Sequence, residues 1–499
     1  MTSKLQTVYA AARSAARLNS AADALQWDEQ TYLPDAAGPY RSGQIADLRR
    51  LAHETLTDPR YADDVRTLAD APESLDAVDA DNVRLLARDL DRDARLDADL
   101  VARVATVTSR GQQVWADARG RNDYAAYTPA LADVVAVKRE VAGRYVDGTD
   151  RPAYDGLLDE YEPDASSDMI AETFARLRGP LVEHLRSIDP ESSRRAVEPL
   201  TRDVPVEAQR GLSRAVAAAV GFDFDRGRLD ETAHPFCTTL GPHDHRILTR
   251  YQSDWFPAGL YGTLHEAGHG MYEQGLPPDR FGLPAGAATS LGIHESQSRL
   301  WENHVGRSMA FCRYLLPVLR DRFGDSVAGV DVGALHRGVN AVRPSLIRVE
   351  ADEVTYNLHV LIRFDLERRL IDGTLDVVNL PDAWNARYAD DLGVTVPDFA
   401  DGVMQDVHWS CGLIGYFPTY TLGNLAAAQL FEAAREQLPG LDDAIAGGEF
   451  AGLLGWLRDN VHRHGRRRTF EQIVVDATGR PLSDEPLIRH LRSVGDQSA

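Results

Sequence analysis

Apolar residues recur every three or four positions along most of this chain, which is the spacing of amphipathic helices. Between residues 5 and 25, for example, Val8, Ala11 and Ala15 fall on one face of a helix. The same spacing continues through residues 80–146, 170–188 and 206–220. Proline-containing breaks separate the helical segments near residues 34–39, 58–59, 150–152, 189–190 and 276–278.

Strand-like patterns are rare, and the candidates are residues 246–251 and 473–476. We therefore predict an all-α protein with one small β-sheet near the active site. The length of 499 residues allows two or three domains. We predict a single domain over residues 1–499, with an N-terminal helical region of about residues 1–230 and a catalytic region of about residues 231–499.

The composition is strongly acidic. The formal net charge is −22, and Lys4 and Lys138 are the only lysines among 54 basic residues. Such a surface disfavours nucleic acid as a partner. It suits concentrated salt, because screening relieves the repulsion between like charges. We therefore expect a halophilic, haloarchaeal source, with an ordinary acidic bacterial protein as the alternative.

Cysteine content and hydropathy predict a cytoplasmic protein. The cysteines are Cys237, Cys312 and Cys411, and so sparse and odd a set does not suggest a disulfide framework. No stretch of about 18 uncharged apolar residues is present, so we expect no membrane span. The first residues lack the apolar core of a signal peptide.

The segment from Leu264 to Gly270 contains the motif HExxH. Positions i and i+4 of a helix lie on one face, so His265 and His269 can direct two imidazoles at one metal ion. Glu266 is placed to take a proton from a metal-bound water. The alternative is a solvated surface helix, but the small residue Gly268 inside the motif favours a closely packed site.

A zinc peptidase of this kind needs a third protein ligand. Glu295 lies on a second expected helix, beyond a turn rich in Gly and Pro over residues 275–289. A His/His/Glu set leaves the fourth position open for water or substrate, as in catalytic zinc sites. We therefore predict one Zn²⁺ per subunit, for which Co²⁺ or another divalent ion can substitute.

Several short motifs occur in order along nearly the whole chain. They are Leu25-Gln26-Trp27-Asp28, His234-Pro235-Phe236, His265 to His269, His294-Glu295-Ser296-Gln297, Ile347 to Asp352, Gly402 to Trp409 and Gly415 to Tyr420. This set resembles the thermostable metallocarboxypeptidases typified by Taq carboxypeptidase. One motif departs from the family, because Leu248 stands where the DxRxT pattern has Thr.

The resemblance implies a metal-dependent carboxypeptidase that hydrolyses the C-terminal peptide bond of peptides and releases single amino acids with broad specificity. Glu266 would be the general base on a metal-bound water. The resemblance also implies an elongated helical subunit with a deep groove, formed in part by the N-terminal region. It implies a homodimer and peptide substrates with a free C-terminus.

A carboxypeptidase must recognise the terminal carboxylate of its substrate, and a guanidinium group does so with two parallel hydrogen bonds. Arg348 is the leading candidate for this clamp and Arg246 the second, with Asp244 as a further substrate-site residue. Alternatively, Arg348 pairs with a core carboxylate such as Glu350 or Asp352.

Other candidates come from the C-terminal motifs. Gln405 and Tyr416 are expected to hydrogen-bond the substrate backbone. His408 or Tyr420 is expected to stabilise the oxyanion, although either fits equally well as a packed core residue. Asp352 and Glu302 are candidates for orienting metal-bound histidines.

Two rival functions remain at this point. The nearer one is an endo-acting oligopeptidase or a dipeptidyl carboxypeptidase on a related helical scaffold. The other is a non-catalytic peptide-binding protein that retained the motif. The intact Glu266 argues against the second rival, because a binding protein has no need for the base.

Overall fold

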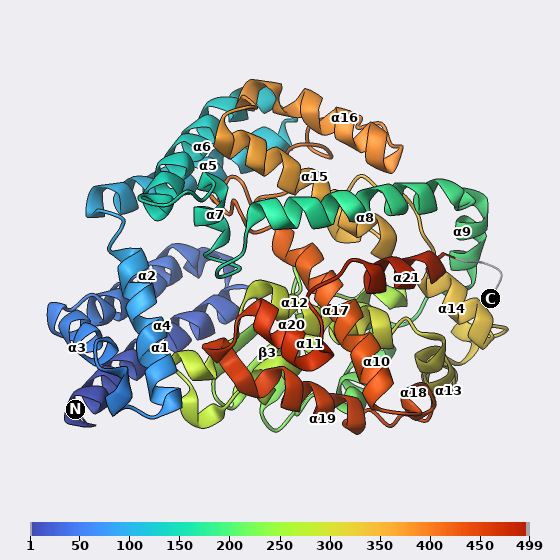
Figure 1. Cartoon of the computed structure of the whole chain (residues 1–499). Helices are drawn as coiled ribbons and strands as arrows, with labels where there is room; N and C mark the ends of the chain where they lie inside the picture. Colours follow the sequence, from blue (N-terminus) through green and yellow to red (C-terminus); the bar gives the residue numbers. More distant parts are fainter. Residues whose placement is uncertain (1, 496–499) are drawn as a thin grey trace. The chain divides into compact units, whose positions relative to one another are not determined.

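The computed structural model describes residues 2–495 (Figure 1). Contacts within the chain divide it into two units, whose segments alternate along the sequence. Unit 1 comprises Met1–Asp91, Glu198–Val339 and Ala427–Pro481. Unit 2 comprises Arg92–Val197, Asn340–Ala426 and Leu482–Ala499. These boundaries do not follow the expected division near residue 230, and the single domain over residues 1–499 stays a prediction.

Helices dominate both units, so the all-α class is confirmed. The helices of unit 1 are α1 (Thr2–Glu29), α2 (Gly38–Leu56), α3 (Pro59–Ala69), α10 (Val206–Val220), α11 (Phe256–Gly275), α12 (Leu291–Arg299), α13 (Met309–Phe323), α14 (Val332–Val339), α18 (Leu441–Ala446), α19 (Ala451–Asn460) and α20 (Phe470–Thr478). Helices α4 (Ala77–Asp93) and α17 (Pro418–Gln437) run across the boundary between the units.

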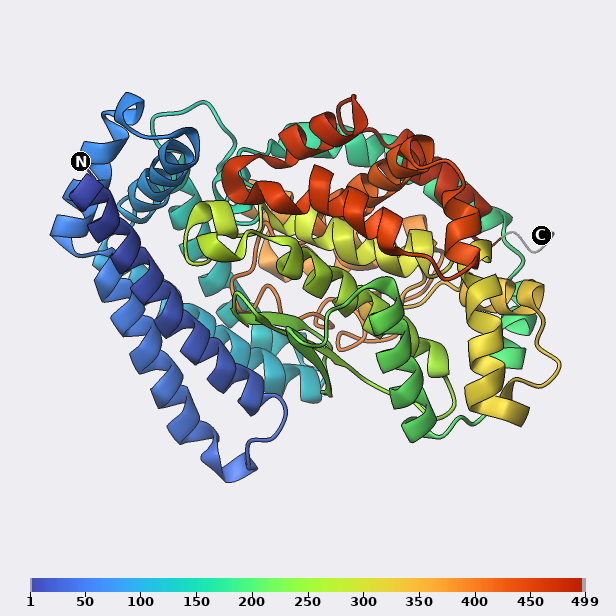
Figure 2. The same ribbon diagram turned by 90° about the horizontal axis from the view of Figure 1, so that it is seen from below.

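The predicted N-terminal helix is confirmed as α1, which pairs with α2 as a long hairpin (Figure 2). Val8, Ala12 and Ala15 of α1 are buried, as the spacing predicts. The break at residues 58–59 begins α3, where the Asp58 carboxylate accepts from the backbone N–H of Arg60. This is the usual chemistry of an N-cap followed by proline.

A three-stranded sheet lies in unit 1 with the order β1-β3-β2. Strand β1 (Gly227–Glu231) is parallel to β3 (Asp244–Thr249), and β2 (Cys237–Gly241) is antiparallel to β3. The sheet packs on α11, the helix that carries HExxH, and a Cβ added at Gly270 would lie 3.0 Å from Ile247. The small sheet therefore lies where it was predicted.

Unit 2 is helical and is built around α15 (Glu353–Asp372). Leu358, Leu361 and Phe364 of α15 are fully buried, and the helix packs against α6, α7, α8 and α16. The helices of this unit are α5 (Ala98–Gly120), α6 (Tyr124–Val146), α7 (Ala153–Leu158), α8 (Ser167–Ser187), α9 (Pro190–Val197), α15, α16 (Leu380–Leu392) and α21 (Glu485–Ser493).

One of the two strand predictions is wrong. Residues 473–476 lie inside α20, although they form a β-branched run. Thr469 and Gln472 form a reciprocal capping box before the run, and Gly479 ends the helix in the left-handed conformation. These local stop and start signals, together with burial of one face, outweigh strand propensity. The other prediction, residues 246–251, largely coincides with β3.

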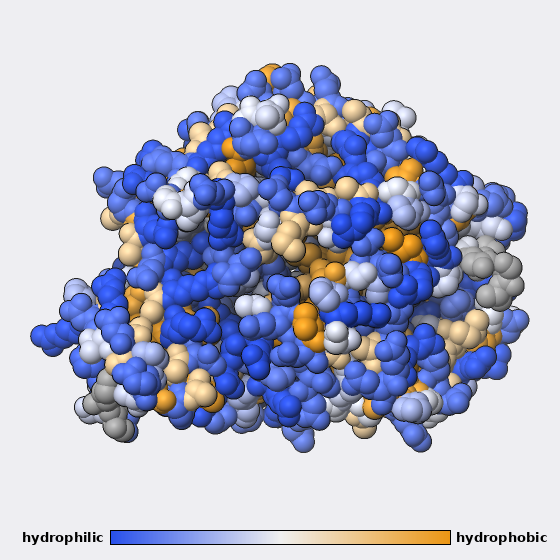
Figure 3. Space-filling view, viewed as in Figure 1, coloured by the Kyte–Doolittle hydropathy of each residue, from blue (hydrophilic) through white to orange (hydrophobic). Residues whose placement is uncertain are grey.

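Hydrophilic residues cover most of the face viewed in Figure 3, in keeping with the acidic composition. Among residues 2–495, no helix combines the length and the apolar character needed to cross a membrane.

Candidate active site

Helix α11 brings the HExxH residues together. It begins after Trp255 with Pro257 in its first turn, and it ends at Gly275, before two prolines. Its apolar positions, including Leu264 and Met271, are fully buried. His265 and His269 lie one turn apart, and their ring centroids are 4.9 Å apart.

Helix α12 packs closely against α11 and carries Glu295. Its N-terminus is capped by Ser290, whose hydroxyl accepts from the N–H of Ile293. A Cβ added at Gly268 would lie 2.6 Å from the backbone of Gln297. Gly268 is therefore required for the close approach of the two helices, which explains a small residue inside the motif.

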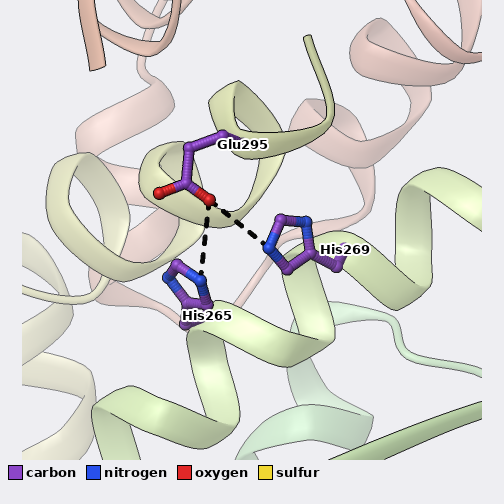
Figure 4. A group of neighbouring side chains, drawn as sticks. All are labelled: His265, His269 and Glu295. Carbon is purple, nitrogen blue, oxygen red and sulfur yellow. Dashed lines mark ion pairs between the residues drawn. The ribbon is translucent and has the colours of Figure 1, made fainter. Parts of the chain in front are cut away.

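Three potential ligand atoms converge between α11 and α12 (Figure 4). Glu295 Oε2 lies 3.4 Å from His269 Nε2 and 3.7 Å from His265 Nε2. In a tetrahedral shell with ligands about 2.0–2.2 Å from a zinc ion, neighbouring ligand atoms are about 3.3–3.6 Å apart. The donor set and its spacing therefore fit a divalent ion such as zinc.

Each histidine of this group is also held through its Nδ1 atom. His265 Nδ1 lies 2.9 Å from Glu302 Oε2, the contact predicted for Glu302. His269 Nδ1 lies 2.6 Å from Nδ1 of His294, and His294 Nε2 lies 2.9 Å from Glu273 Oε1. Both rings can therefore present Nε2 to an ion.

Glu302 lies in a segment where the chain changes its helical winding after α12. Residues Leu300–Val305 form a π-helix, η6, directly after Arg299. The carboxylate of Glu302 also receives hydrogen bonds from Arg299 and Arg307. π-Helical turns are rare and are frequent at functional sites.

Glu295 is kept ionised by its neighbours. Its Oε1 accepts from Arg299 Nε at 2.7 Å, and its Oε2 accepts from the Ser298 hydroxyl at 2.9 Å. Burial alone would raise the pKa of Glu295, but the charges of Arg299 and His265 outweigh burial and hold the pKa well below its usual range. The carboxylate is therefore a permanent anion and a suitable metal ligand.

Glu266 differs from Glu295 because its charge is poorly compensated. The residue is 5% exposed, and its Oε2 atom is buried without a hydrogen-bond partner. Burial raises the pKa of Glu266 to about 7, with a further contribution from the charge of Glu295. A buried carboxylate with an unpaired oxygen and a pKa near neutrality has the properties of a general base.

The structure places Arg246 and Asp244 together on β3, in unit 1. Arg246 Nε and Nη2 donate to the two oxygens of Asp244, at 3.0 and 2.9 Å. The guanidinium group stacks on Trp27 at 4.2 Å. Side chains alternate along a strand, and Ile247 faces α11, so Arg246 points to the opposite face of the sheet. Its fork is therefore engaged within the protein.

Arg348 lies in unit 2, where it is buried and paired with a carboxylate. Its Nε and Nη2 donate to Asp406 Oδ1 at 3.2 and 2.9 Å, and its Nη1 donates to the Tyr356 hydroxyl at 3.2 Å. The partner is Asp406 rather than Glu350 or Asp352. Arg348 thus forms an ion pair with a core carboxylate, as the alternative interpretation of this residue predicts. Its role in binding the substrate carboxylate stays a prediction.

Gln405 forms hydrogen bonds with two arginines of the same cluster. Its Oε1 accepts from Arg348 N–H at 2.9 Å and from Arg363 Nη2 at 2.8 Å. Its Nε2 donates to the carbonyl oxygens of Leu346 and Asp401. A hydrogen bond to a substrate backbone would require Gln405 to release one of these partners.

His408, Tyr416 and Tyr420 lie beside this cluster in unit 2. The His408 ring is 5.5 Å from Tyr416, which is 5.4 Å from Tyr420. Arg348 lies over the Tyr420 ring at 5.2 Å. Burial, helped by Arg348, lowers the pKa of His408 to about 4, so this ring is neutral at physiological pH. Tyr416 and Tyr420 are partly exposed.

Sequence reasoning gave no role to His294, Glu273 or Arg299. Each had a signal, because His294 precedes Glu295, Glu273 follows His269 by one helical turn, and Arg299 follows Glu295 by one turn. It also missed Arg363, which is fully buried and donates to Asp406 at 2.7 Å. Arg363 lies outside the matched motifs and gave no local signal.

An all-α chain in which two helices bring two histidines and two buried glutamates together has the residues expected at the site of a helical metallopeptidase. Comparison with known proteins agrees, since residues 7–494 match the family model of the Carboxypeptidase Taq (M32) metallopeptidases. The chain belongs to this family of metallocarboxypeptidases.

Its relatives match over nearly their whole length. "Thermostable carboxypeptidase 1" of Thermus thermophilus is 43% identical over 488 residues, which cover 96% of each chain. The crystal structure of an M32 carboxypeptidase from Deinococcus radiodurans is 37% identical with a TM-score of 0.93, and 99% of each chain is covered. Trypanosoma cruzi metallocarboxypeptidase 1 is 32% identical with a TM-score of 0.94, over 99% of this chain and 100% of that one.

Proposed function

We propose that this chain is a zinc-dependent carboxypeptidase that removes single residues, with broad specificity, from peptides with a free C-terminus. His265, His269 and Glu295 would hold one divalent ion per subunit. The observation that carries the proposal is the convergence of their three ligand atoms beside the buried, unpaired oxygen of Glu266. Co²⁺ or another divalent ion is expected to substitute for zinc, because such nitrogen and oxygen sites bind several metals.

A bound divalent ion supplies Lewis acidity for the scissile carbonyl and for water. The proton chemistry belongs to Glu266, whose Oε2 takes a proton from the attacking water and passes it to the leaving amine. Burial raises the pKa of this carboxyl group to about 7. Its Oε2 atom has no hydrogen-bond partner and is therefore available to a water molecule.

The free edge of β2 supports a peptide substrate. Phe236 O accepts from Leu248 N–H, and Thr238 pairs with Arg246, so the peptide groups of Cys237 point away from β3. Within residues 2–495, no strand pairs with β2 on that side. Strand β2 packs against α11, the helix that carries Glu266, and the charge of Glu266 adds to burial in raising the pKa of the Cys237 thiol. A substrate backbone would pair with the free edge of β2 as an added strand.

We retain Arg348 as the proposed clamp for the terminal carboxylate. Both of its bonds to Asp406 go to the single oxygen Oδ1, and partly exposed Tyr420 lies against it. The ion pair holds the guanidinium group in one orientation, which reduces the entropy lost when a substrate binds. Arg246 is the weaker candidate because it points to the face of the sheet opposite α11, the helix that carries the candidate ligands, and stacks there on Trp27.

Mass spectrometry of a peptide mixture, treated with the zinc-loaded protein, tests the reaction. Stepwise loss of single C-terminal residues is expected, with C-terminally amidated peptides left intact. Internal fragments would indicate an oligopeptidase, released dipeptides a dipeptidyl carboxypeptidase, and an unchanged mixture a binding protein. Glu266→Gln should keep the metal and lose about 10²–10⁴-fold in turnover. Near-normal turnover of this variant would refute the role of Glu266.

The clamp is tested with a peptide and its amide. Arg348→Ala should lower kcat/KM for the free acid strongly and reduce the preference over the amide. Arg348→Lys should restore only part of it, because an ammonium group cannot form two parallel bonds. Arg246→Ala is the matched comparison and should leave the preference intact. If only Arg246→Ala removes the preference, Arg246 is the clamp.

We also propose a homodimer located in the cytoplasm. The dimer follows from the family resemblance, and light scattering during size-exclusion chromatography tests it. The cytoplasmic location agrees with Cys237, Cys312 and Cys411, all of which are free thiols. Cell fractionation with an antibody tests the location.

A further inference from the structure

The two histidines of the candidate metal site are held in different ways. His265 Nδ1 contacts a carboxylate directly, at Glu302. His269 Nδ1 contacts the imidazole of His294 instead, and the carboxylate of Glu273 lies beyond that ring. A direct carboxylate contact is the usual arrangement for a metal-bound histidine, so the second arrangement needs a physical explanation.

The carboxylate of Glu273 determines which groups donate and which accept in the series His269–His294–Glu273. An ionised carboxylate can only accept, so His294 must donate to Glu273 Oε1 from Nε2–H. If His269 binds the ion through Nε2, its proton is on Nδ1, so Nδ1 of His294 must accept that proton's hydrogen bond with a lone pair. This lone pair accepts from His269 Nδ1–H, which leaves the lone pair of His269 on Nε2, the atom that lies 3.4 Å from Glu295 Oε2.

Geometry explains why an imidazole stands between the two groups. Glu273 and His269 are one turn apart on α11, and both side chains rise from the same face of that helix. His294 comes from α12 and contacts both of them, at 2.6 and 2.9 Å. Glu295 is therefore one potential ligand, and the residue before it, His294, supports another, His269.

The carboxylate of Glu273 is itself fixed. Its Oε2 accepts from the Thr239 hydroxyl of β2 at 3.2 Å, while its Oε1 faces His294. Thr239 also lies 3.1 Å from the ring of His245 on β3. The small sheet thus orients Glu273, so that one oxygen is directed at His294.

We propose that Glu273 is a positioning residue for the metal, which acts through His294 by selecting the tautomer that accepts from His269. The inference rests on the proposed function, since it takes His269 as a metal ligand. Glu273 has no contact with the ion or the substrate in this scheme. Its effect on the metal must therefore disappear when His294 no longer connects it to His269.

The experiment measures the Zn²⁺ dissociation constant by chelator competition, and the visible spectrum of the Co²⁺ form. Glu273→Ala should weaken Zn²⁺ binding by about 10–100-fold, the usual effect of losing such a support, and should change the Co²⁺ spectrum. Glu273→Gln keeps an acceptor for His294 and should restore most of the affinity. Glu54→Ala, which removes an exposed carboxylate of α2, is the matched control and should leave the affinity unchanged.

His294→Asn provides the decisive test. The Asn amide oxygen can replace Nδ1 as an acceptor for His269, but it has no link to Glu273. In this background, Glu273→Ala should have less than about a twofold effect, because additivity fails for residues that act through one another. An undiminished loss in this background, or a wild-type affinity in Glu273→Ala alone, would overturn the proposal.

Failure of the proposed function is recognised separately. His269→Ala removes the ligand itself, so it should abolish Zn²⁺ binding whatever Glu273 does. If His269→Ala retains full Zn²⁺ affinity, the ligand assignment fails. If His269→Ala loses the ion but Glu273→Ala binds Zn²⁺ as tightly as the wild type, only the positioning role of Glu273 fails. Circular dichroism of the metal-free variants confirms that each one is folded.

Discussion

Unit 1 and unit 2 each bury a cluster of charged residues, and the two clusters are organised differently. In unit 1, His265, His269 and Glu295 direct lone pairs at one point, and Glu266 keeps an oxygen without a partner. In unit 2, Asp406 lies between Arg348 and Arg363, with nitrogen–oxygen distances of 2.9 and 2.6 Å.

In the cluster of unit 2, the charges pair with one another. Arg348 and Arg363 hold the pKa of Asp406 far below its usual range despite burial, which alone would raise it. In the cluster of unit 1, Arg299 pairs with Glu295, whereas no ion pair of the described residues includes Glu266, and burial raises its pKa to about 7. Paired charges indicate a structural or orienting role, whereas converging acceptors indicate a site for an ion.

The largest expected effect concerns the cluster of unit 1. His269→Ala should abolish ion binding and peptidase activity, because a site with one imidazole and one carboxylate cannot hold a catalytic ion. The metal-free variant loses the His269–His294 contact but no buried ion pair, so its free energy of unfolding should fall by less than that of Asp406→Asn. Metal analysis and denaturant unfolding check both statements, and a large loss of stability without metal would break the comparison.

Asp406→Asn should have its main effect on stability. It leaves the fully buried Arg363 and the buried Arg348 without their carboxylate, and breaking a buried ion pair costs about 3–5 kcal/mol. The measurement is the free energy of unfolding in urea. Glu54→Gln is the matched control, because the exposed Arg50–Glu54 pair should contribute less than about 1 kcal/mol. Equal effects of the two substitutions would remove the distinction between the clusters.

Acid should destabilise both units through buried neutral histidines. Burial lowers the pKa of His462 in unit 1 to about 3 and of His408 in unit 2 to about 4. Both rings are neutral in the folded protein and titrate near pH 6.5 when unfolded. The stability that depends on these neutral rings is fully present above about pH 6.5. Each ring then lowers the free energy of unfolding by up to about 1.4 kcal/mol per pH unit as the pH falls toward its folded pKa.

The measurement is the free energy of unfolding between pH 6.5 and 5. His462→Gln and His408→Gln should each reduce the slope with pH by about one proton. If one variant leaves the slope unchanged, the histidine of that unit is protonated in the folded state and the units differ in this respect as well.

The smallest expected effect comes from salt, which acts on exposed charges and leaves both buried clusters nearly unchanged. The net charge of −22 and the two lysines predict that KCl raises the melting temperature, because screening reduces repulsion. Thermal unfolding from low salt to molar KCl checks this. A melting temperature that stays flat or falls would count against a halophilic source.

Much of the fold and part of the candidate site could be predicted from local sequence. Helical spacing predicted α1, α8 and α10, because side chains three and four residues apart share a face. The same rule placed His265 and His269 together. The strand predicted at residues 473–476 failed because capping and burial outweighed the preference of β-branched residues.

Tertiary structure decided what the local pattern could not express. Arg348 was a candidate from its motif, but its partner Asp406 is 58 residues away. The link from Glu273 through His294 to His269 depends on the approach of α12 to α11 at Gly268. The sequence alone determined the helices, the acidic surface and the residue types of the metal site, because these depend on spacing and composition. Only the packed structure decided which buried groups are paired, because pairing depends on contacts between residues distant in the chain.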